Sequence, residues 1–219
     1  MAGTLISHFK FDNNLEDFVG SNDMTAGGSG NSFSTTIKKY GTHSLQLNGS
    51  GWARKASQTG VDTGNSDISF GGWIYPTTAA NVESLGSLGV NSAINNSCLW
   101  MTKLNATTIR VDLASDALSF TVPAMSNTTW YHVWCEYVAS TKTSSLYLNN
   151  ALSSSGAQAH GANLALNATT DIQIGVDPDD NSAFTGNMDD WRFYNGITTA
   201  AQRAAIYTIV EFVPRVVMF

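Results

Sequence analysis

Short apolar segments recur along the whole chain and are separated by polar loops that contain glycine. In several of these segments apolar and polar residues alternate, which is typical of a strand with one buried and one solvated face. Spacing of this kind predicts an all-β sandwich and excludes a helical bundle. The segments are Leu5–Phe11, Ser44–Asn48, Ile68–Tyr75, Cys98–Lys103, Thr108–Leu113, Leu118–Val122, Trp130–Val138, Ser144–Leu148, Asp171–Gly175 and Gly186–Tyr194.

The local signals between these segments agree with that prediction. Ser, Thr, Asn and Gly together make up more than a third of the 219 residues, a supply that favours strands and turns. Asn149-Asn150 predicts a two-residue hairpin, because asparagine tolerates the positive φ that such a turn needs. One short helix is predicted over Thr199–Tyr207, where Thr199 and Gln202 form a capping box.

Charge and hydropathy exclude two classes of partner. The formal net charge is −6, and the 11 Lys and Arg residues are scattered rather than clustered, which argues against nucleic-acid binding. No apolar run approaches the roughly 18–20 residues of a membrane span, so no membrane insertion is expected. The chain is predicted to be soluble and to lack a Sec signal peptide. Cys98 and Cys135 lie in apolar runs and are expected to be two buried thiols.

Four stretches occur in a fixed order: His8–Asp12 with Asp17–Asp23, Gly41–Gly49 with Ile68–Pro76, Thr129–Val133 with Leu146–Asn150, and Phe184–Asn195 with the Thr199–Tyr207 helix. In order and spacing they resemble the laminin-G-like jelly roll of the concanavalin A-like lectin/glucanase superfamily. The resemblance implies a two-sheet antiparallel jelly-roll sandwich with one short C-terminal helix, formed by residues 1–208. The chain departs from the family pattern in the opening loop, where Phe18 and Val19 replace a serine.

Hydrolases of this fold use paired carboxylates across a sugar-binding cleft. The Glu-x-Asp-x-x-Glu run of the jelly-roll glucanases is absent, and the glutamates are scattered. Asp189 and Asp190 are adjacent on a predicted strand, so their side chains are expected to point to opposite faces and not to act as a pair. His8 and His132 are expected to be packed strand residues. We therefore predict that the protein is not an enzyme.

The resemblance implies one candidate cofactor, a structural calcium ion that joins the first loop to the last strand. The residues in the matching positions are Asp17, Asn22 and Asp189, with hydrogen bonding within the loops as the alternative role. The run Asp177–Asn181 begins like an EF-hand loop, but it lacks the glycine and the glutamate that follow, and it is interpreted as a solvated turn.

Tryptophans are the candidate contacts for a glycan or a protein partner, because sugar faces stack on exposed aromatic rings. Three of them, Trp73, Trp130 and Trp191, fall at positions that resemble core residues of the family. The other three are the candidates, and they are Trp52, Trp100 and Trp134.

The C-terminal segment, residues 209–219, is apolar and follows the family-like domain. It is predicted to be an assembly contact, with folding back under its own helix as the alternative. The residues expected to make that contact are Phe212, Val213, Val216, Val217, Met218 and Phe219.

These features predict a non-catalytic binding or structural module. The leading interpretation is a virion-associated subunit, such as a phage capsid-decorating or tail-attached protein. Such a subunit would be a homo-oligomer or part of a larger particle, on a virion surface or another extracellular-facing assembly. The alternatives are a free carbohydrate-binding lectin, which would bind sugar as an isolated chain, and a diverged glycoside hydrolase.

Overall fold

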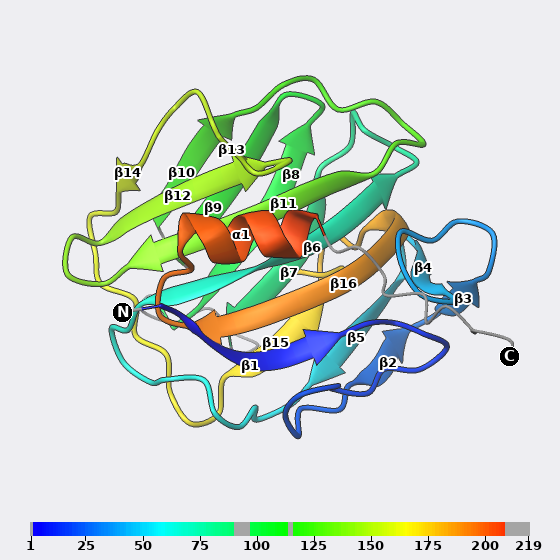
Figure 1. The fold of residues 1–219 in the computed structure, drawn as a ribbon, viewed down its shortest axis with the longest axis horizontal. Helices are drawn as coiled ribbons and strands as arrows, with labels where there is room; N and C mark the ends of the chain where they lie inside the picture. The colour runs from blue at the N-terminus through cyan, green and yellow to red at the C-terminus, as the bar shows by residue number, and fades with distance from the viewer. Residues whose placement is uncertain (1, 90–96, 114–115, 209–219) are drawn as a thin grey trace, which may run out of the picture.

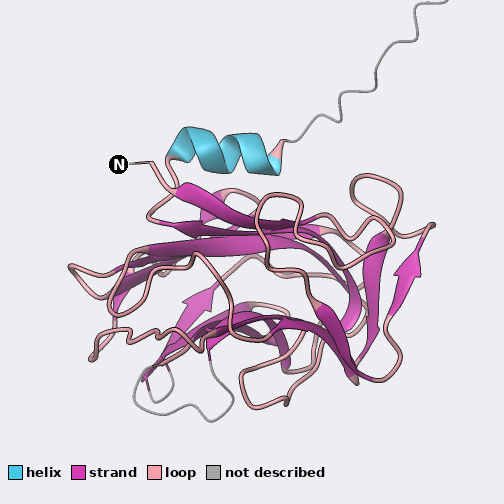
Figure 2. Cartoon of the chain, turned by 90° about the horizontal axis from the view of Figure 1, so that it is seen from below, coloured by secondary structure: helices cyan, strands magenta, loops and turns pink. Residues whose placement is uncertain are grey.

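A computed structural model describes residues 2–89, 97–113 and 116–208. Two antiparallel sheets pack face to face, and one helix lies on the outside of the first sheet (Figures 1 and 2). The described residues therefore form a jelly-roll sandwich, and the predicted fold class is confirmed.

The helix-covered sheet has nine strands. Along its main path they are β13 (Ala151–Leu152), β12 (Thr143–Leu148), β11 (Tyr131–Val138), β6 (Ile68–Pro76), β16 (Thr185–Asn195), β4 (Ser44–Asn48) and β3 (Ser32–Ser34). Two further strands lie off this path: β1 (Thr4–Phe9) pairs with β16, and β14 (Gln158–Ala159) pairs with β12.

The second sheet has seven strands. In spatial order they are β10 (Asp116–Thr121), β9 (Thr108–Leu113), β8 (Leu99–Asn105), β7 (Glu83–Gly89), β15 (Asp171–Ile174), β5 (Gly51–Lys55) and β2 (Thr25–Gly28). Alternate residues of both sheets point inward, and they form one large apolar cluster between them.

Trp191 belongs to this core and is fully buried. Its indole fits because Gly72 on β6 and Gly86 on β7 have no side chain. A Cβ added at either glycine would lie 2.5 Å from a carbon of the ring. Two glycines from different sheets thus make room for one large side chain of β16, which fixes the inward orientation of that strand.

The helix α1 (Ala200–Tyr207) begins as predicted, with Thr199 as N-cap and Gln202 completing the capping box. Its one fully buried residue, Ile206, packs against Trp134 and Tyr194 on the outer face of the helix-covered sheet. The guanidinium of Arg203 also donates to a carboxylate oxygen of Glu136 at 2.7 Å. The helix therefore covers part of a face that would otherwise be exposed.

Two local predictions are also confirmed. Asn149 and Asn150 have φ of 51° and 63° and join β12 to β13 as a tight hairpin. Cys98 and Cys135 are both buried. The predicted assembly residues between 209 and 219 lie outside the described residues. Within the described residues, no helix combines the length and hydropathy needed to cross a membrane.

Candidate functional site

Two strands share one edge of β16. β4 pairs with Thr185–Met188, and β1 pairs with Trp191–Asn195, so Asp189 and Asp190 lie between the ends of the two neighbours. On the opposite edge, the register with β6 shifts between Asp189 and Arg192, which is a β-bulge. Asp190 takes a positive φ of 53° within it. A bulge adds one residue to a strand and redirects its side chains.

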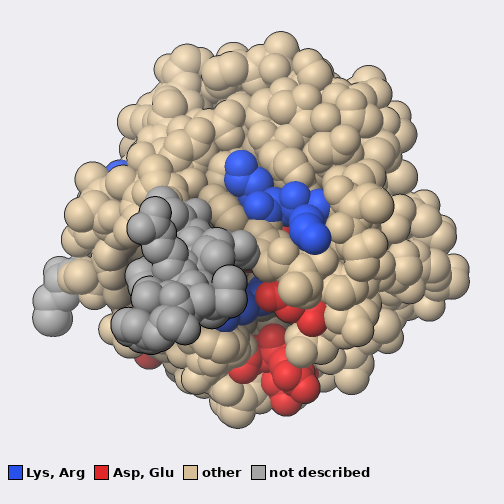
Figure 3. All heavy atoms as spheres, turned by 45° about the vertical axis from the view of Figure 1, so that its right-hand side comes forward, with Lys and Arg blue, Asp and Glu red and all other residues tan. Residues whose placement is uncertain are grey.

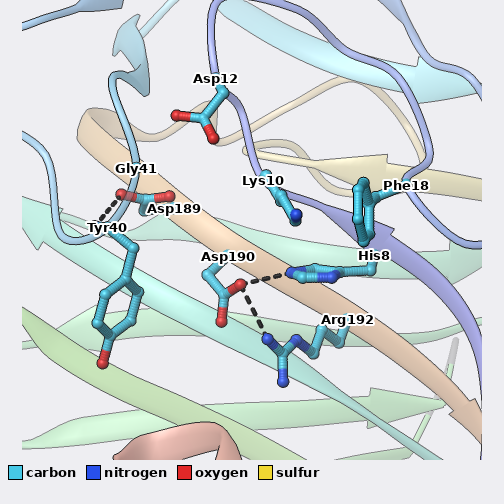
Figure 4. Close-up of a pocket in the computed structure, with 9 residues that line it drawn as sticks. All are labelled: His8, Lys10, Asp12, Phe18, Tyr40, Gly41, Asp189, Asp190 and Arg192. Atoms are coloured by element: carbon cyan, nitrogen blue, oxygen red, sulfur yellow. Dashed lines mark hydrogen bonds and ion pairs between the residues drawn. The ribbon is translucent and has the colours of Figure 1, made fainter. Parts of the chain in front are cut away.

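The bulge corrects the prediction that Asp189 and Asp190 point to opposite faces. Strict alternation would place one carboxylate in the core, whereas the extra residue turns both outward and leaves Met188 and Trp191 buried inside. Both carboxylates line one pocket of about 310 Å³, which we call the β16 pocket. Four parts of the chain form its walls: the strand β1, the opening loop, the loop that precedes β4, and the strand β16. The lining residues are His8, Lys10, Asp12, Phe18, Tyr40, Gly41, Asp189, Asp190 and Arg192 (Figure 4).

One oxygen of each carboxylate is held by the protein. Oδ1 of Asp190 lies 2.5 Å from Nε2 of His8 and accepts a hydrogen bond from the Arg192 guanidinium at 3.1 Å. Oδ2 of Asp189 accepts the backbone N–H groups of Lys39 and Tyr40 at 2.8 and 3.0 Å. The other oxygen of each carboxylate, Oδ1 of Asp189 and Oδ2 of Asp190, is buried without a hydrogen-bond partner among the described residues.

Burial dominates the electrostatics of this pocket. It raises the pKa of Asp189 to about 8. The nearby charges of Asp190 and Asp12 also raise this pKa, whereas the hydrogen bonds from the Lys39 and Tyr40 backbone N–H groups lower it. Burial, followed by the charges of Asp190 and Asp189, raises the pKa of Tyr40 to about 12. The pocket therefore disfavours negative charge.

The opening loop supplies the rim. Phe18 exposes 66% of its side chain, and the Lys10 ammonium lies 3.1 Å from the centre of its ring. The edge of the His8 ring meets the same phenyl group at 5.9 Å between centroids. Figure 4 shows Phe18 next to Lys10 and above the His8 ring. Phe18, which stands with Val19 where the family pattern has a serine, thus places an exposed aromatic ring at the mouth of the β16 pocket.

Charged side chains line the β16 pocket, among them Lys10, Asp12 and Arg192. On the face drawn in Figure 3, acidic and basic groups lie next to each other on a largely uncharged surface. Asp12 stabilises the neighbouring loop by accepting hydrogen bonds from the Thr42 hydroxyl at 3.0 Å and from the His43 backbone at 3.2 Å. Asp12 therefore ties the opening loop to the loop before β4.

Two of the predicted calcium ligands lie in the opening loop, and the third, Asp189, lies on β16. Asp17 and Asn22 lie together in the opening loop, where the Asp17 carboxylate accepts the backbone N–H groups of His8, Val19 and Asn22. Burial raises the pKa of Asp17, but hydrogen bonds from His8, Gly20, Val19 and Ser7 outweigh it, and the net pKa is lowered.

Asp189 lies instead in the β16 pocket. No group of three or more His, Cys, Asp or Glu side chains in the described ranges is placed to hold a metal ion. Asp17 and Asn22 take part in hydrogen bonds of the opening loop, and calcium binding stays a prediction. Asp177 in the rival loop accepts the backbone N–H groups of Asp179 and Asn181, as expected of a turn.

The candidate tryptophans are separated in the fold. Trp134 is 0% exposed under α1, where its indole N–H donates to Thr198, so its predicted role as a sugar platform is wrong for this structure. The cause is the docking of α1 onto the outer face of β11. Trp100 is 9% exposed on β8, and Trp52 is half-buried on β5. A contact at Trp52 or Trp100 stays a prediction.

Sequence reasoning missed most of the β16 pocket, although a signal was present. His8, Lys10 and Asp12 alternate with the fully buried Phe9 and Phe11, and that pattern predicts a polar row on the outer face. His8, expected to be only a packed residue, belongs to this row. His132 is packed as expected, with its ring stacked 5.8 Å from that of Trp134.

Comparison with known proteins agrees with this architecture. The sequence model of Laminin_G_3, described as the concanavalin A-like lectin/glucanases superfamily, matches residues 47–202. A search of curated protein sequences finds no match to the chain.

Several solved structures share the fold at low sequence identity. Domain 4 of AbnA, an extracellular GH43 arabinanase of Geobacillus stearothermophilus determined with arabinotriose, is 17% identical with a TM-score of 0.70, and the match covers 94% of this chain and 100% of that domain. The CBM40 of the Ruminococcus gnavus IT-sialidase, bound to α2,3-sialyllactose, is 13% identical with a TM-score of 0.53 over 65% of this chain and 83% of that one. The botulinum neurotoxin serotype G binding domain is 15% identical with a TM-score of 0.66 over 93% of this chain and 50% of that one.

Proposed function

The chain belongs to the concanavalin A-like lectin/glucanase superfamily, and we propose that it is a non-catalytic binding module that holds a carbohydrate in the β16 pocket. The observation that carries this proposal is the pair of buried carboxylate oxygens, one on Asp189 and one on Asp190, that lack a protein partner. Buried polar atoms without a partner are rare and costly in folded proteins. Sugar hydroxyl groups both donate and accept, so they can satisfy the Asp190 carboxylate oxygen and the Asp189 carboxyl group, whose raised pKa lets it keep a proton.

The composition of the pocket supports the same ligand class. Carboxylates, a guanidinium and an imidazole line its floor, and the exposed ring of Phe18 stands at its rim. A sugar has polar edges and an apolar face, so it fits a site of this kind. Two structural neighbours, the AbnA domain and the CBM40, were determined with bound oligosaccharides, which supports the proposal at the level of the fold.

One observation favours a second candidate, a glycoside hydrolase. Asp189 and Asp190 share the β16 pocket, and the raised pKa of Asp189, about 8, is a property of general acids in such enzymes. Both carboxylates are nevertheless fixed by protein donors, which suits them to act as hydrogen-bond acceptors. The experiment below therefore measures turnover as well as binding.

Asp190→Asn is expected to weaken carbohydrate binding by more than tenfold, because an amide cannot both keep the His8 and Arg192 contacts and offer a second acceptor. A glycan array identifies the ligand, and calorimetry measures the dissociation constant for the wild type and the variant. Asp179→Asn, an exposed carboxylate on another loop, is the matched control, and Trp52→Phe tests the rival tryptophan site.

Binding that survives in Asp190→Asn but is lost in Trp52→Phe would move the site to β5 and contradict the proposal. Release of reducing sugar by the wild type that disappears in Asp189→Asn would identify a hydrolase instead.

We further propose that the module is a subunit of a larger particle, such as a phage virion, and is displayed on its outer surface. This proposal rests on the sequence, namely the low lysine content and the apolar segment 209–219. Deleting residues 210–219 is expected to yield a folded monomer that no longer oligomerises or enters particles, as measured by light scattering and particle pull-down. A truncated chain that fails to fold would assign the segment to its own core.

A further inference from the structure

We propose that the β16 pocket is one half of a longer site, and that the module binds a chain of at least two linked sugar units rather than a single sugar. This inference rests on the proposed carbohydrate-binding function and specifies the length of the ligand and the residues that hold its second unit. It is carried by a second cavity that adjoins the β16 pocket and shares part of its wall.

The second cavity, which we call the loop cavity, is formed by the opening loop and has a volume of about 240 Å³. Its lining residues are Lys10, Asp12, Asn14, Glu16, Asp17 and Phe18. Three of these residues, Lys10, Asp12 and Phe18, also line the β16 pocket. The two cavities are therefore neighbours, and these three side chains form the boundary between them.

The residues that line the two cavities follow one another in the chain. His8 lines the β16 pocket and not the loop cavity, whereas Asn14 and Glu16 line the loop cavity and not the β16 pocket. Lys10 and Asp12 come between them and line both. Every second residue of this stretch thus contributes to the wall. A linear ligand that follows the stretch would meet both cavities in turn.

Each cavity is small. Pockets for drug-sized ligands enclose about 300–1,000 Å³. The β16 pocket, at about 310 Å³, lies at the lower end of that range, and the loop cavity lies below it. A single sugar in the β16 pocket would leave the loop cavity to water. Two linked units would fill both cavities and remove more apolar surface from water at their boundary.

Phe18 stands at that boundary as a fixed platform. Its ring contacts the Lys10 ammonium and the His8 ring, yet Phe18 exposes 66% of its side chain (Figure 4). The ammonium covers one face of the ring, so the rest of the ring is open to a ligand. A sugar chain that crosses the boundary can lay an apolar face on it. A ring that is held before binding loses little conformational entropy when the ligand arrives.

The loop cavity offers polar groups to the second unit. Asn14 donates from Nδ2 to Oε2 of Glu16 at 3.1 Å, and both side chains are exposed. An amide nitrogen carries two hydrogens and a carboxylate has two oxygens, so each side chain keeps a group for a sugar hydroxyl. The Asp17 carboxylate instead accepts three backbone N–H groups of the opening loop and shapes the wall.

Calorimetry with oligosaccharides of increasing length tests the inference. The probes are oligomers of one to four units of β-1,4-linked glucose, β-1,4-linked N-acetylglucosamine and α-1,5-linked arabinose, together with the tightest-binding array sugar and its fragments of one and two units. For the sugars that bind, the dissociation constant is expected to fall at least about tenfold from one unit to two. Equal dissociation constants for one and two units would overturn the inference and leave the proposed function intact. Absence of binding by any sugar would overturn both.

Variants of the opening loop locate the second unit. The double variant Asn14→Ala/Glu16→Ala alters the loop cavity alone, so it should bind a single unit as the wild type does and lose at least threefold of the gain from the second. Phe18→Ala removes the platform and should also reduce that gain. Val19→Ala, an exposed neighbour that lines neither cavity, is the matched control and should preserve it. A gain that persists in both the double variant and Phe18→Ala would place the second unit elsewhere and overturn the inference.

Discussion

Lys103→Met is expected to lower the free energy of unfolding by about 3–5 kcal/mol, which is the cost of breaking a buried ion pair by removing one partner. Lys103 is 0% exposed, and its ammonium lies 3.0 Å from a carboxylate oxygen of Glu83. The same ammonium donates to the backbone oxygens of Thr78, Ala79 and Asn81 at 3.1, 3.1 and 2.6 Å. Methionine fills similar space but leaves the buried Glu83 carboxylate without its counter-ion and takes the ammonium donor away from the three carbonyl groups.

Urea denaturation of the wild type and the variant measures this change, with Lys55→Met as the control for loss of a positive charge on a strand. The double variant Glu83→Met/Lys103→Met should regain only part of the lost free energy of unfolding. It removes the unpaired carboxylate, but the three carbonyl groups still lack the ammonium donor. A Lys103→Met protein as stable as the Lys55→Met protein would show that this pair does not hold the loop between β6 and β7.

Asp189→Asn is expected to become more stable relative to the wild type as pH rises from 5 to 8. The native pKa of Asp189, about 8, lies above its ordinary value of 3.8, so the native state keeps a proton that the unfolded chain releases. The free energy of unfolding of the wild type therefore falls with pH across this interval, on the order of a few kcal/mol. Asparagine cannot ionise, so the free energy of unfolding of the Asp189→Asn protein does not fall with pH for this reason.

Denaturation at several pH values measures the difference between the two proteins. The difference is the informative quantity, because Asp112, whose pKa burial raises to about 6, titrates in the same interval in both. Glu16→Gln, an exposed carboxylate, is the control and should run parallel to the wild type. A constant difference between Asp189→Asn and the wild type from pH 5 to 8 would show that Asp189 is ionised in the native protein.

The features that the sequence predicted correctly are local or periodic. The recurring apolar segments located most of the strands, although β2, β3, β5, β7 and β14 were not among them. The side chains of Thr199 and Gln202 identified the start of the helix. The Asn149-Asn150 turn is likewise determined by neighbouring residues, because positive φ is a property of the residue itself.

The features that the sequence did not predict depend on contacts between distant segments. The bulge at Asp189 and Asp190 forms where β4 and β1 end against the same edge of β16, and no local pattern marks that meeting point. Trp134 is buried because a helix more than 60 residues later packs over it. Lys103 falls in phase with Leu99 and Met101, which indicates burial, but the carbonyl groups that surround its ammonium come from the loop after β6.

Amide chemical-shift mapping with the tightest-binding array sugar tests most directly whether the β16 pocket is the binding site. The account predicts that the largest shifts occur at His8, Lys10, Asp190 and Arg192, and that they disappear in Asp190→Asn. Largest shifts on the second sheet around Trp52 or Trp100, with β1 and β16 unchanged, would contradict it.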